Sequence, residues 1–277
     1  MDQQKLYKQL DEAEKRALAR WDRWIQQTFK TIPWREYERL QKIGGPRALE
    51  QAPVPITINA GALARLLANH AVEMLMAGQA HAQLLVEDLH RQYGRKLAEY
   101  PGFEFDYNED PRVIPEKAIR AMEARSVALA GDVDGSLLAQ VKRIMNNFLA
   151  ASSTRPEAEE AVEALLNSTE ERASLITTTE TTYSYNRGRL AGYRENQVDY
   201  VRFSAIRDAR TSQICNSRHG LLMRMDDSNL GANTPPLHGR CRSVLDPVYS
   251  IYQPELIVAK NLEWKHVAPL PPGWRAA

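Results

Sequence analysis

Both cysteines of this 277-residue chain lie in one short window together with two histidines, and this window constrains the fold more than any other feature. His219 follows Cys215 after three intervening residues, and Cys241 follows His238 after two. Zn²⁺ takes four nitrogen or sulfur ligands in a tetrahedron, and proteins usually supply them as two close pairs separated by a longer stretch of chain. The spacing therefore predicts a structural zinc site made of these four side chains.

The spacing alone leaves three other uses of these side chains open. The thiols could simply be buried and inert, because free cysteine behaves as a small apolar residue. A disulfide would need an oxidising compartment, and the charged stretch from Met1 to Lys15 lacks the apolar segment of a signal peptide, so we expect a reducing one. A catalytic cysteine is the weakest alternative, because neither histidine lies in a sequence that resembles a nucleophile signature.

Composition places the chain among ordinary globular proteins. Hydrophobic residues make up 43% of the sequence and charged residues 26%, and 36 basic residues nearly balance 35 acidic ones. This balance argues against a protein whose main task is to coat nucleic acid, since that task needs a clustered basic excess. The most apolar stretch, 60–86, is interrupted by charged and polar residues, so we expect no membrane span.

Helical patterns dominate the sequence before residue 197. Apolar residues recur every three or four positions from Leu6 to Thr28, and the stretch from Ala60 to about Leu97 predicts one long helix or a pair of helices. Trp21 and Trp24 lie on the first apolar stripe. We expect them to pack on the protein's own helices, with a partner-binding face as the alternative.

The region from Glu116 to Arg194 predicts a compact bundle of short helices. A turn is expected at the Gly-Asp-Val-Asp-Gly stretch 131–135, and Ser168 to Glu171 matches a capping box that would start a new helix. Weak alternation in Phe103–Tyr107 predicts a short strand before this region.

After Asn196 the composition shifts toward residues that favour strands. Segments 198–203, 220–225 and 242–245 predict three short strands, which can bury little surface, so a bound metal would compensate for a small core. We expect an α+β fold, mainly helical with a small C-terminal, zinc-stabilised β module. The predicted domains are an N-terminal helical region (1–110), a central helical bundle (111–196), the small β module (197–250) and an extended C-terminal tail (251–277).

A series of short motifs between Glu180 and Val248 carries a family resemblance. In chain order they are Glu180 followed by TTYSYNRGRLAGYR (181–194), YVRFSA (200–205), DART (208–211), Cys215, His219-Gly220 and PPLHGRCR (235–242). Their order and spacing resemble the C-terminal domain of the phage Mu F-like head-morphogenesis family, the minor head proteins of tailed phages.

The chain departs from the pattern of that family at three positions. Ser212 and Ser243 stand where the family commonly has cysteines, and Gly239 stands where it has a proline. Three ligand positions are kept: Cys215, His238 and Cys241. The resemblance therefore implies a zinc site in which His219 replaces a missing thiolate, with Asp208 as a reserve ligand.

The resemblance implies a minor head protein that acts in procapsid assembly and in genome packaging or delivery near the portal. Its expected partners are the portal protein, the major capsid or scaffold protein, and DNA. It would lie inside the capsid of the virion, and in the host cytoplasm during assembly. We expect anchoring through the N-terminal helix and the Trp-bearing tail, so that a chain without residues 1–30, or without the tail after Trp264, should fold but stay out of procapsids.

We expect binding rather than catalysis, because the sequence contains no readable nucleophile or phosphate-binding loop. The polar residues of the matched helix should hold that helix to the β module rather than act on a substrate; they are Glu180, Asn186, Arg187 and Arg189. Two alternatives remain: a toxin-like or other enzyme built on the same module, and a zinc-dependent nucleic-acid-binding protein.

Overall fold

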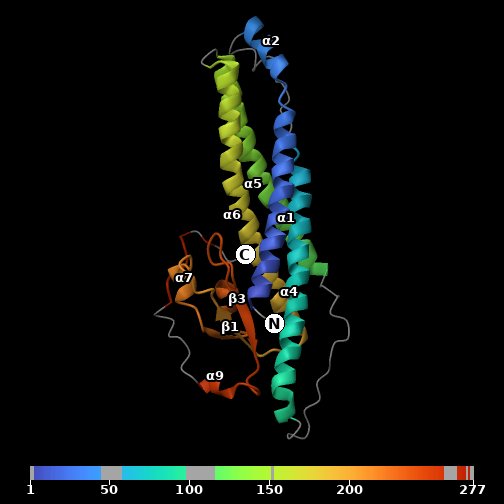
Figure 1. Cartoon of the computed structure of the whole chain (residues 1–277), viewed down its shortest axis with the longest axis vertical. Coiled ribbons are helices and arrows are strands. Elements are labelled where there is room, and N and C mark those ends of the chain that lie inside the picture. The colour runs from blue at the N-terminus through green and yellow to red at the C-terminus, as the bar shows by residue number, and fades with distance from the viewer. Residues whose placement is uncertain are drawn as a thin grey trace. The chain divides into compact units, whose positions relative to one another are not determined.

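The computed structural model describes residues 3–44, 58–97, 116–150, 153–258, 267–272 and Trp274 (Figure 1). Within these residues five helices come first: α1 (Gln3–Lys30), α2 (Trp34–Gly44), α4 (Ala60–Leu97), α5 (Glu116–Leu149) and α6 (Arg155–Glu195). Short elements follow: β1 (Tyr200–Ser204), α7 (Gln213–Asn216), β2 (Leu222–Arg224), α8 (Leu230–Asn233), β3 (Val244–Val248) and α9 (Pro254–Val258). The predicted fold class, mainly helical with a small C-terminal sheet, is confirmed. The predicted strand at Phe103–Tyr107 lies outside the described residues.

The chain forms two compact units, and each long helix except α2 contributes residues to both. Unit 1 consists of Met1–Glu14, His70–Met122 and Leu175–Ala277, and unit 2 consists of Lys15–Asn69 and Glu123–Ser174. Within the described residues, no helix is both long enough and apolar enough to cross a membrane.

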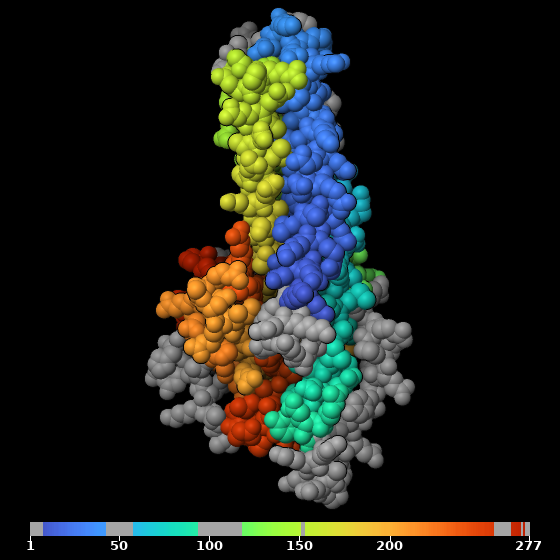
Figure 2. All heavy atoms as spheres, in the orientation of Figure 1, coloured from blue at the N-terminus to red at the C-terminus, as the bar shows by residue number. Residues whose placement is uncertain are grey.

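Unit 2 contains the two tryptophans of the first apolar stripe. Trp21 is 1% exposed and Trp24 is 6% exposed, and their rings meet edge to face with centroids 6.2 Å apart. The indole nitrogen of Trp24 donates a hydrogen bond to the carbonyl of Asn59 at 3.0 Å. Figure 2 shows α1 (blue) beside the N-terminal half of α6 (yellow-green) in this unit. The prediction that both rings pack on the protein's own helices is confirmed.

The prediction of short helices between Glu116 and Arg194 is wrong, because α5 and α6 are long and continuous. The stretch 131–135 is helical, and Val133 within it is buried on the same face as Leu137. A glycine inside a helix costs about 1 kcal/mol relative to alanine, which such burial outweighs. The capping box at 168–171 does not form either. The Ser168 and Thr169 hydroxyls donate to the carbonyl of Leu165, at 2.8 and 2.7 Å, within α6.

The sheet of unit 1 has three antiparallel strands in the order β2-β1-β3. Tyr200 at the start of β1 lies opposite Arg224 on one side and Val248 on the other. The strands predicted at 198–203 and 220–225 are confirmed with small shifts. The third strand begins later than predicted and includes Pro247, which is compatible with a sheet because β3 is an edge strand.

Helices α4 and α6 cross in unit 1 with their backbones in direct contact. A Cβ atom on Gly188 would lie 2.0 Å from the carbonyl oxygen of Leu75, and one on Gly78 would lie 2.1 Å from that of Tyr185. Real Cβ atoms essentially never come within 3.0 Å of such an atom. The two glycines therefore permit a crossing that no larger residue would allow.

Polar side chains of α6 hold this helix to β3. Asn186 donates to the carbonyl of Ser243 and accepts from the amide of Leu245, both at 3.1 Å. The buried guanidinium of Arg189 pairs with Asp246 at 3.1 Å. Two more hydrogen bonds run from α6 to backbone carbonyls of this region: Thr182 to Cys241 and Tyr193 to Leu245. The predicted structural role is thus confirmed for Asn186 and Arg189.

Replacing Asn186 by alanine is expected to destabilise the protein by about 2 kcal/mol, because the carbonyl of Ser243 and the amide of Leu245 lose the hydrogen bonds to its side chain. Urea denaturation followed by circular dichroism measures this change. Asn147→Ala is the matched control, since Asn147 is exposed in the last turn of α5 and should change the free energy of unfolding by less than about 0.5 kcal/mol. Equal effects of the two substitutions would contradict the assignment.

The C-terminal segment differs from the extended tail that the sequence predicts. It contains helix α9, and its later part binds back to the module of the same chain. The amide of Ala268 donates to the Ser217 hydroxyl at 3.0 Å, and the buried Arg218 side chain donates to the Ala268 carbonyl at 2.8 Å. The Trp274 indole donates to the carbonyl of Pro236 at 3.2 Å. Trp274 therefore has a partner within its own chain.

Candidate metal centre

Two local structures in unit 1 bring the two cysteines and one histidine together. Cys215 lies in α7, whose N-cap is Ser212; the Ser212 hydroxyl accepts from the Cys215 amide at 3.2 Å. His238 and Cys241 are joined by a tight turn in which the Cys241 amide donates to the His238 carbonyl at 3.3 Å. Arg240 has a φ of 57° in this turn, as the third residue of a type II turn requires.

The ligand atoms of Cys215, His238 and Cys241 all lie within 4.8 Å of one another, and we call these residues the Cys-His-Cys group. The two Sγ atoms are 3.6 Å apart, and Cys215 Sγ is 3.1 Å from His238 Nε2. Two thiolates at ~2.3 Å from one tetrahedral ion would be ~3.8 Å apart. The spacing in the structure is close to that value, so the group could hold a metal ion.

The backbone also sets the orientation of the imidazole ring. His238 Nδ1 lies 2.8 Å from the carbonyl oxygen of Gly239, which can only accept a hydrogen bond, so Nδ1 carries the proton. In the neutral ring this leaves the lone pair on Nε2, the nitrogen that faces the thiols. Histidines that bind metal ions are usually oriented by such a hydrogen bond from the other ring nitrogen.

Hydrogen bonding favours a thiolate at Cys215. The hydrogen bond with the Cys241 thiol lowers the pKa of Cys215 most, and hydrogen bonds with His238, Ser243 and Ser212 lower it further, against the effect of burial. The same contact with Cys215, together with burial, raises the pKa of Cys241, and the hydrogen bond with Cys215 raises the pKa of His238. A metal binds the thiolate form of cysteine, so the lowered pKa of Cys215 favours metal binding.

His219, the fourth predicted ligand, is not part of the group. Its Nδ1 accepts a hydrogen bond from the amide of Ala205 at 3.2 Å, beside β1. The chain turns immediately after it, because Gly220 has a φ of 87° and donates its amide proton to the carbonyl of Phe203 at 2.8 Å. This turn leads the chain into β2. The spacing of the sequence could not show that the His219 side chain bonds to the backbone just after β1 and not to the thiols.

Asp208, the reserve ligand, is also engaged elsewhere. Both of its carboxylate oxygens accept hydrogen bonds from Arg242, at 2.7 and 2.9 Å, and the amide of Arg210 donates to one of them at 2.9 Å. The Arg242 guanidinium holds the pKa of this carboxyl well below its usual range. Asp208 fixes the loop before α7, and it is not part of the Cys-His-Cys group.

Ser212 and Ser243 contact the group, although the sequence marked them only as departures from a family pattern. The Ser212 hydroxyl lies 2.8 Å from His238 Nε2. The Ser243 hydroxyl forms a hydrogen bond with Cys215, and Ser243 is 2% exposed. The position of these serines at cysteine sites of the family was the signal that could have placed them here. Nothing in the sequence indicated that the Gly239 carbonyl would orient the His238 ring.

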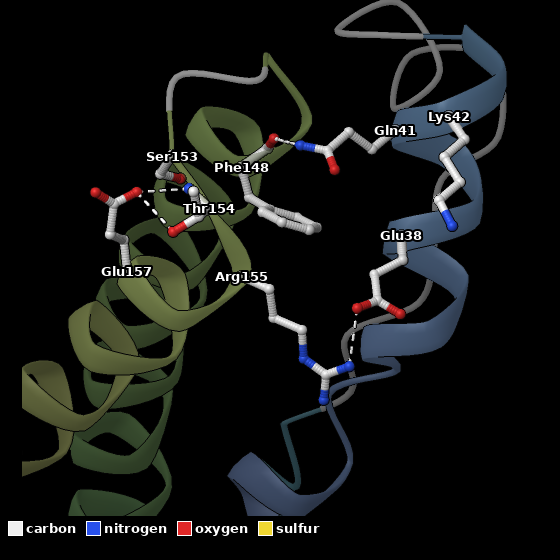
Figure 3. A pocket seen from close by; sticks show the side chains of 8 residues that line it. All are labelled: Glu38, Gln41, Lys42, Phe148, Ser153, Thr154, Arg155 and Glu157. Atoms are coloured by element: carbon white, nitrogen blue, oxygen red, sulfur yellow. Dashed lines mark hydrogen bonds and ion pairs between the residues drawn. The ribbon is translucent and has the colours of Figure 1, made fainter.

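A second polar site lies in unit 2 and is a pocket between α2 and the start of α6 (Figure 3). Arg155 pairs across it with Glu38 at 2.8 Å, and Glu157 accepts hydrogen bonds from the amide and hydroxyl of Thr154. The Arg155–Glu38 pair compensates two of the charges in this pocket, whereas Glu157 bonds to neutral groups of Thr154.

The comparison with known protein families falls on the region that contains this group. Residues 139–246 match the family described as Phage Mu protein F like protein. The match begins in α5, well before the motifs seen in the sequence, and covers all of α6 and the sheet as far as Asp246. No curated protein and no solved structure gives a significant match to the chain. The resemblance seen in the sequence is confirmed over this region: residues 139–246 are similar to the Phage Mu protein F like family, and the Cys-His-Cys group lies within them.

Proposed function

We propose that this protein is a minor head protein of a tailed bacteriophage that acts in procapsid assembly and in genome packaging or delivery near the portal. The match of residues 139–246 to the Mu F-like family carries this proposal, because that family suggests a phage head-morphogenesis protein. The partners would be the portal protein, the major capsid or scaffold protein, and DNA. The protein would be found in the virion, inside the capsid, after assembly in the host cytoplasm.

Within this function we propose that the Cys-His-Cys group holds a structural Zn²⁺. Cys215 would supply a ligand from α7, and His238 and Cys241 would supply two from the turn that precedes β3. A bound ion would supply a cross-link between these segments. The sheet packs on α4 and α6 in a hydrophobic core that includes both cysteines, and a cross-link between α7 and the turn before β3 would add to the stability of that core.

The role that we propose is binding and not turnover. The polar residues of the matched helix that would be candidates for catalysis are used in packing. Asn186 and Arg189 hold α6 to β3, and Glu180 is only 6% exposed, which leaves little room for a substrate beside its carboxylate.

Because α1 contributes to the core, deleting it is not a suitable test of whether α1 anchors the protein to the portal or capsid. Removing residues 1–30 would take Trp21, Trp24 and their neighbours out of the core, so we expect such a chain to lose stability and the truncation cannot isolate anchoring. Substitutions of exposed residues are the appropriate probe. Lys15 and Arg20 are both exposed on α1 and available for charge reversal.

Inactivating the gene in the phage that encodes this protein is expected to give heads that lack the protein and are defective in assembly, DNA content or DNA delivery. Complementation with the wild-type chain should restore infectivity, and mass spectrometry of purified virions should detect the protein together with portal protein. Lys15→Glu with Arg20→Glu should reduce incorporation of the folded protein if α1 contacts the portal. Fully infectious virions without any copy of this protein would refute the proposal.

A further inference from the structure

The Cys-His-Cys group supplies three of the four ligands that zinc takes in a structural site. Among the described histidine, cysteine and acidic side chains, these three are the ones that lie close enough together to share one ion. His219 and Asp208, the two side chains expected to complete it, are held in other hydrogen bonds. Among the described residues, the fourth position is therefore left to a hydroxyl group or to a ligand from solution.

Ser212 is the residue placed to define that position. Its Oγ atom is 2.8 Å from His238 Nε2, the nitrogen that faces the thiols. The same atom accepts the amide proton of Cys215, so the N-cap of α7 fixes the hydroxyl in place. Ser212 is only partly buried, whereas Ser243, the other hydroxyl at the group, is almost completely buried. The side of the group at Ser212 is thus the side nearer to solvent.

We propose that the fourth coordination position of the bound metal lies at Ser212 and is exchangeable. This inference rests on the proposed metal site. A neutral hydroxyl or water is a weaker ligand for Zn²⁺ than a thiolate or an imidazole, so a small thiol from solution can replace it. Such a thiol binds as a thiolate, displaces the water and releases one proton to the solvent. The site therefore resembles a three-ligand centre with an open position more than a closed structural one.

Titration of the full-length, metal-free protein with Co²⁺ tests this proposal, because the cobalt spectrum reports both affinity and the number of thiolate ligands. Ser212→Cys places a third thiolate at the fourth position. We expect it to tighten Co²⁺ binding by about tenfold or more and to raise the sulfur-to-cobalt absorption by about half. We expect 2-mercaptoethanol to raise the same absorption in the wild-type protein but not in Ser212→Cys.

Two control variants separate this geometry from simpler explanations. Ser217→Cys adds a thiol to the end of the same short helix, but the Ser217 hydroxyl faces Ile214 and Ala268, so this variant should keep the wild-type spectrum. His219→Ala should also leave the affinity unchanged. Equal affinity and absorption for Ser212→Cys and the wild type, or loss of Co²⁺ binding in His219→Ala, would overturn the proposal.

A wild-type protein that binds neither Co²⁺ nor Zn²⁺ would overturn this inference together with the proposed zinc. The proposed function as a head protein is tested by a different measurement, the incorporation of the protein into virions, and does not depend on a bound metal. Normal metal binding with an inert fourth position would overturn only the inference about Ser212.

Discussion

Gly188→Ala is expected to destabilise the protein by about 3 kcal/mol, because the crossing of α4 and α6 has no space for a methyl group. The new Cβ atom would lie 2.0 Å from the carbonyl oxygen of Leu75 and 3.0 Å from the amide nitrogen of Gln79. Both are backbone atoms, so no side chain can rotate away to relieve the overlap. The helices would have to move apart, and α6 would then draw its hydrogen-bonding groups away from β3.

Gly135→Ala is the matched control for this substitution. Gly135 also lies inside a long helix, α5, but a Cβ atom on it would meet nothing within 4 Å. Alanine should therefore stabilise that helix by about 0.5–1 kcal/mol through its higher helix propensity. Thermal and urea unfolding of the two variants should change in opposite directions. A Gly188→Ala protein as stable as the wild type would show that the helices do not cross this closely.

This crossing also gives a physical reason for part of the sequence motif. Within the stretch YNRGR, Asn186 bonds to β3, Gly188 permits the contact with α4, and Arg189 pairs with Asp246. Three neighbouring positions of one helix thus serve three different contacts. The motif identified the region from sequence alone, but the reason for each residue depends on partners more than fifty positions away in the chain.

The sequence predicted those features of the fold that depend on local patterns. The 3.6-residue periodicity located α1 and α4, and the β-forming segments after Asn196 located the strands. The predicted breaks in α5 and α6 were wrong because glycines and hydroxyl residues are common to turns and to helix interiors, and only packing decides between them. In α6 the Thr169 hydroxyl bonds to the carbonyl one turn earlier and so costs the helix little.

Three of the four predicted metal ligands do lie together in the structure, and the fourth, His219, shows what spacing in the sequence cannot predict. Cys215, His238 and Cys241 meet because a helix cap and a tight turn face each other. His219 has a plausible spacing from Cys215, yet the backbone reverses at Gly220 and places its ring beside β1. A pair spacing in sequence cannot show which side of a turn a side chain occupies.

Removal of the metal is expected to have the largest effect on stability. If free zinc exceeds the dissociation constant a thousandfold, binding to the folded state alone contributes about 4 kcal/mol, and a chelator should abolish that contribution. Unfolding followed by circular dichroism with and without EDTA measures it, and elemental analysis of the purified protein gives the amount of bound zinc. Protein that carries no zinc, and whose unfolding is unaffected by EDTA, would contradict the proposed structural metal.

His238→Gln and His219→Gln form a matched pair for this prediction, since both replace an imidazole by an amide within the same module. His238 lies in the Cys-His-Cys group, so its replacement should release the metal and remove the response of unfolding to EDTA. His219 accepts a single hydrogen bond from Ala205, so its replacement should cost about 1 kcal/mol and leave the metal bound. The two variants therefore separate the loss of a ligand from the loss of an ordinary hydrogen bond. Release of zinc by both substitutions would return His219 to the ligand set, and release by neither would remove His238 from it.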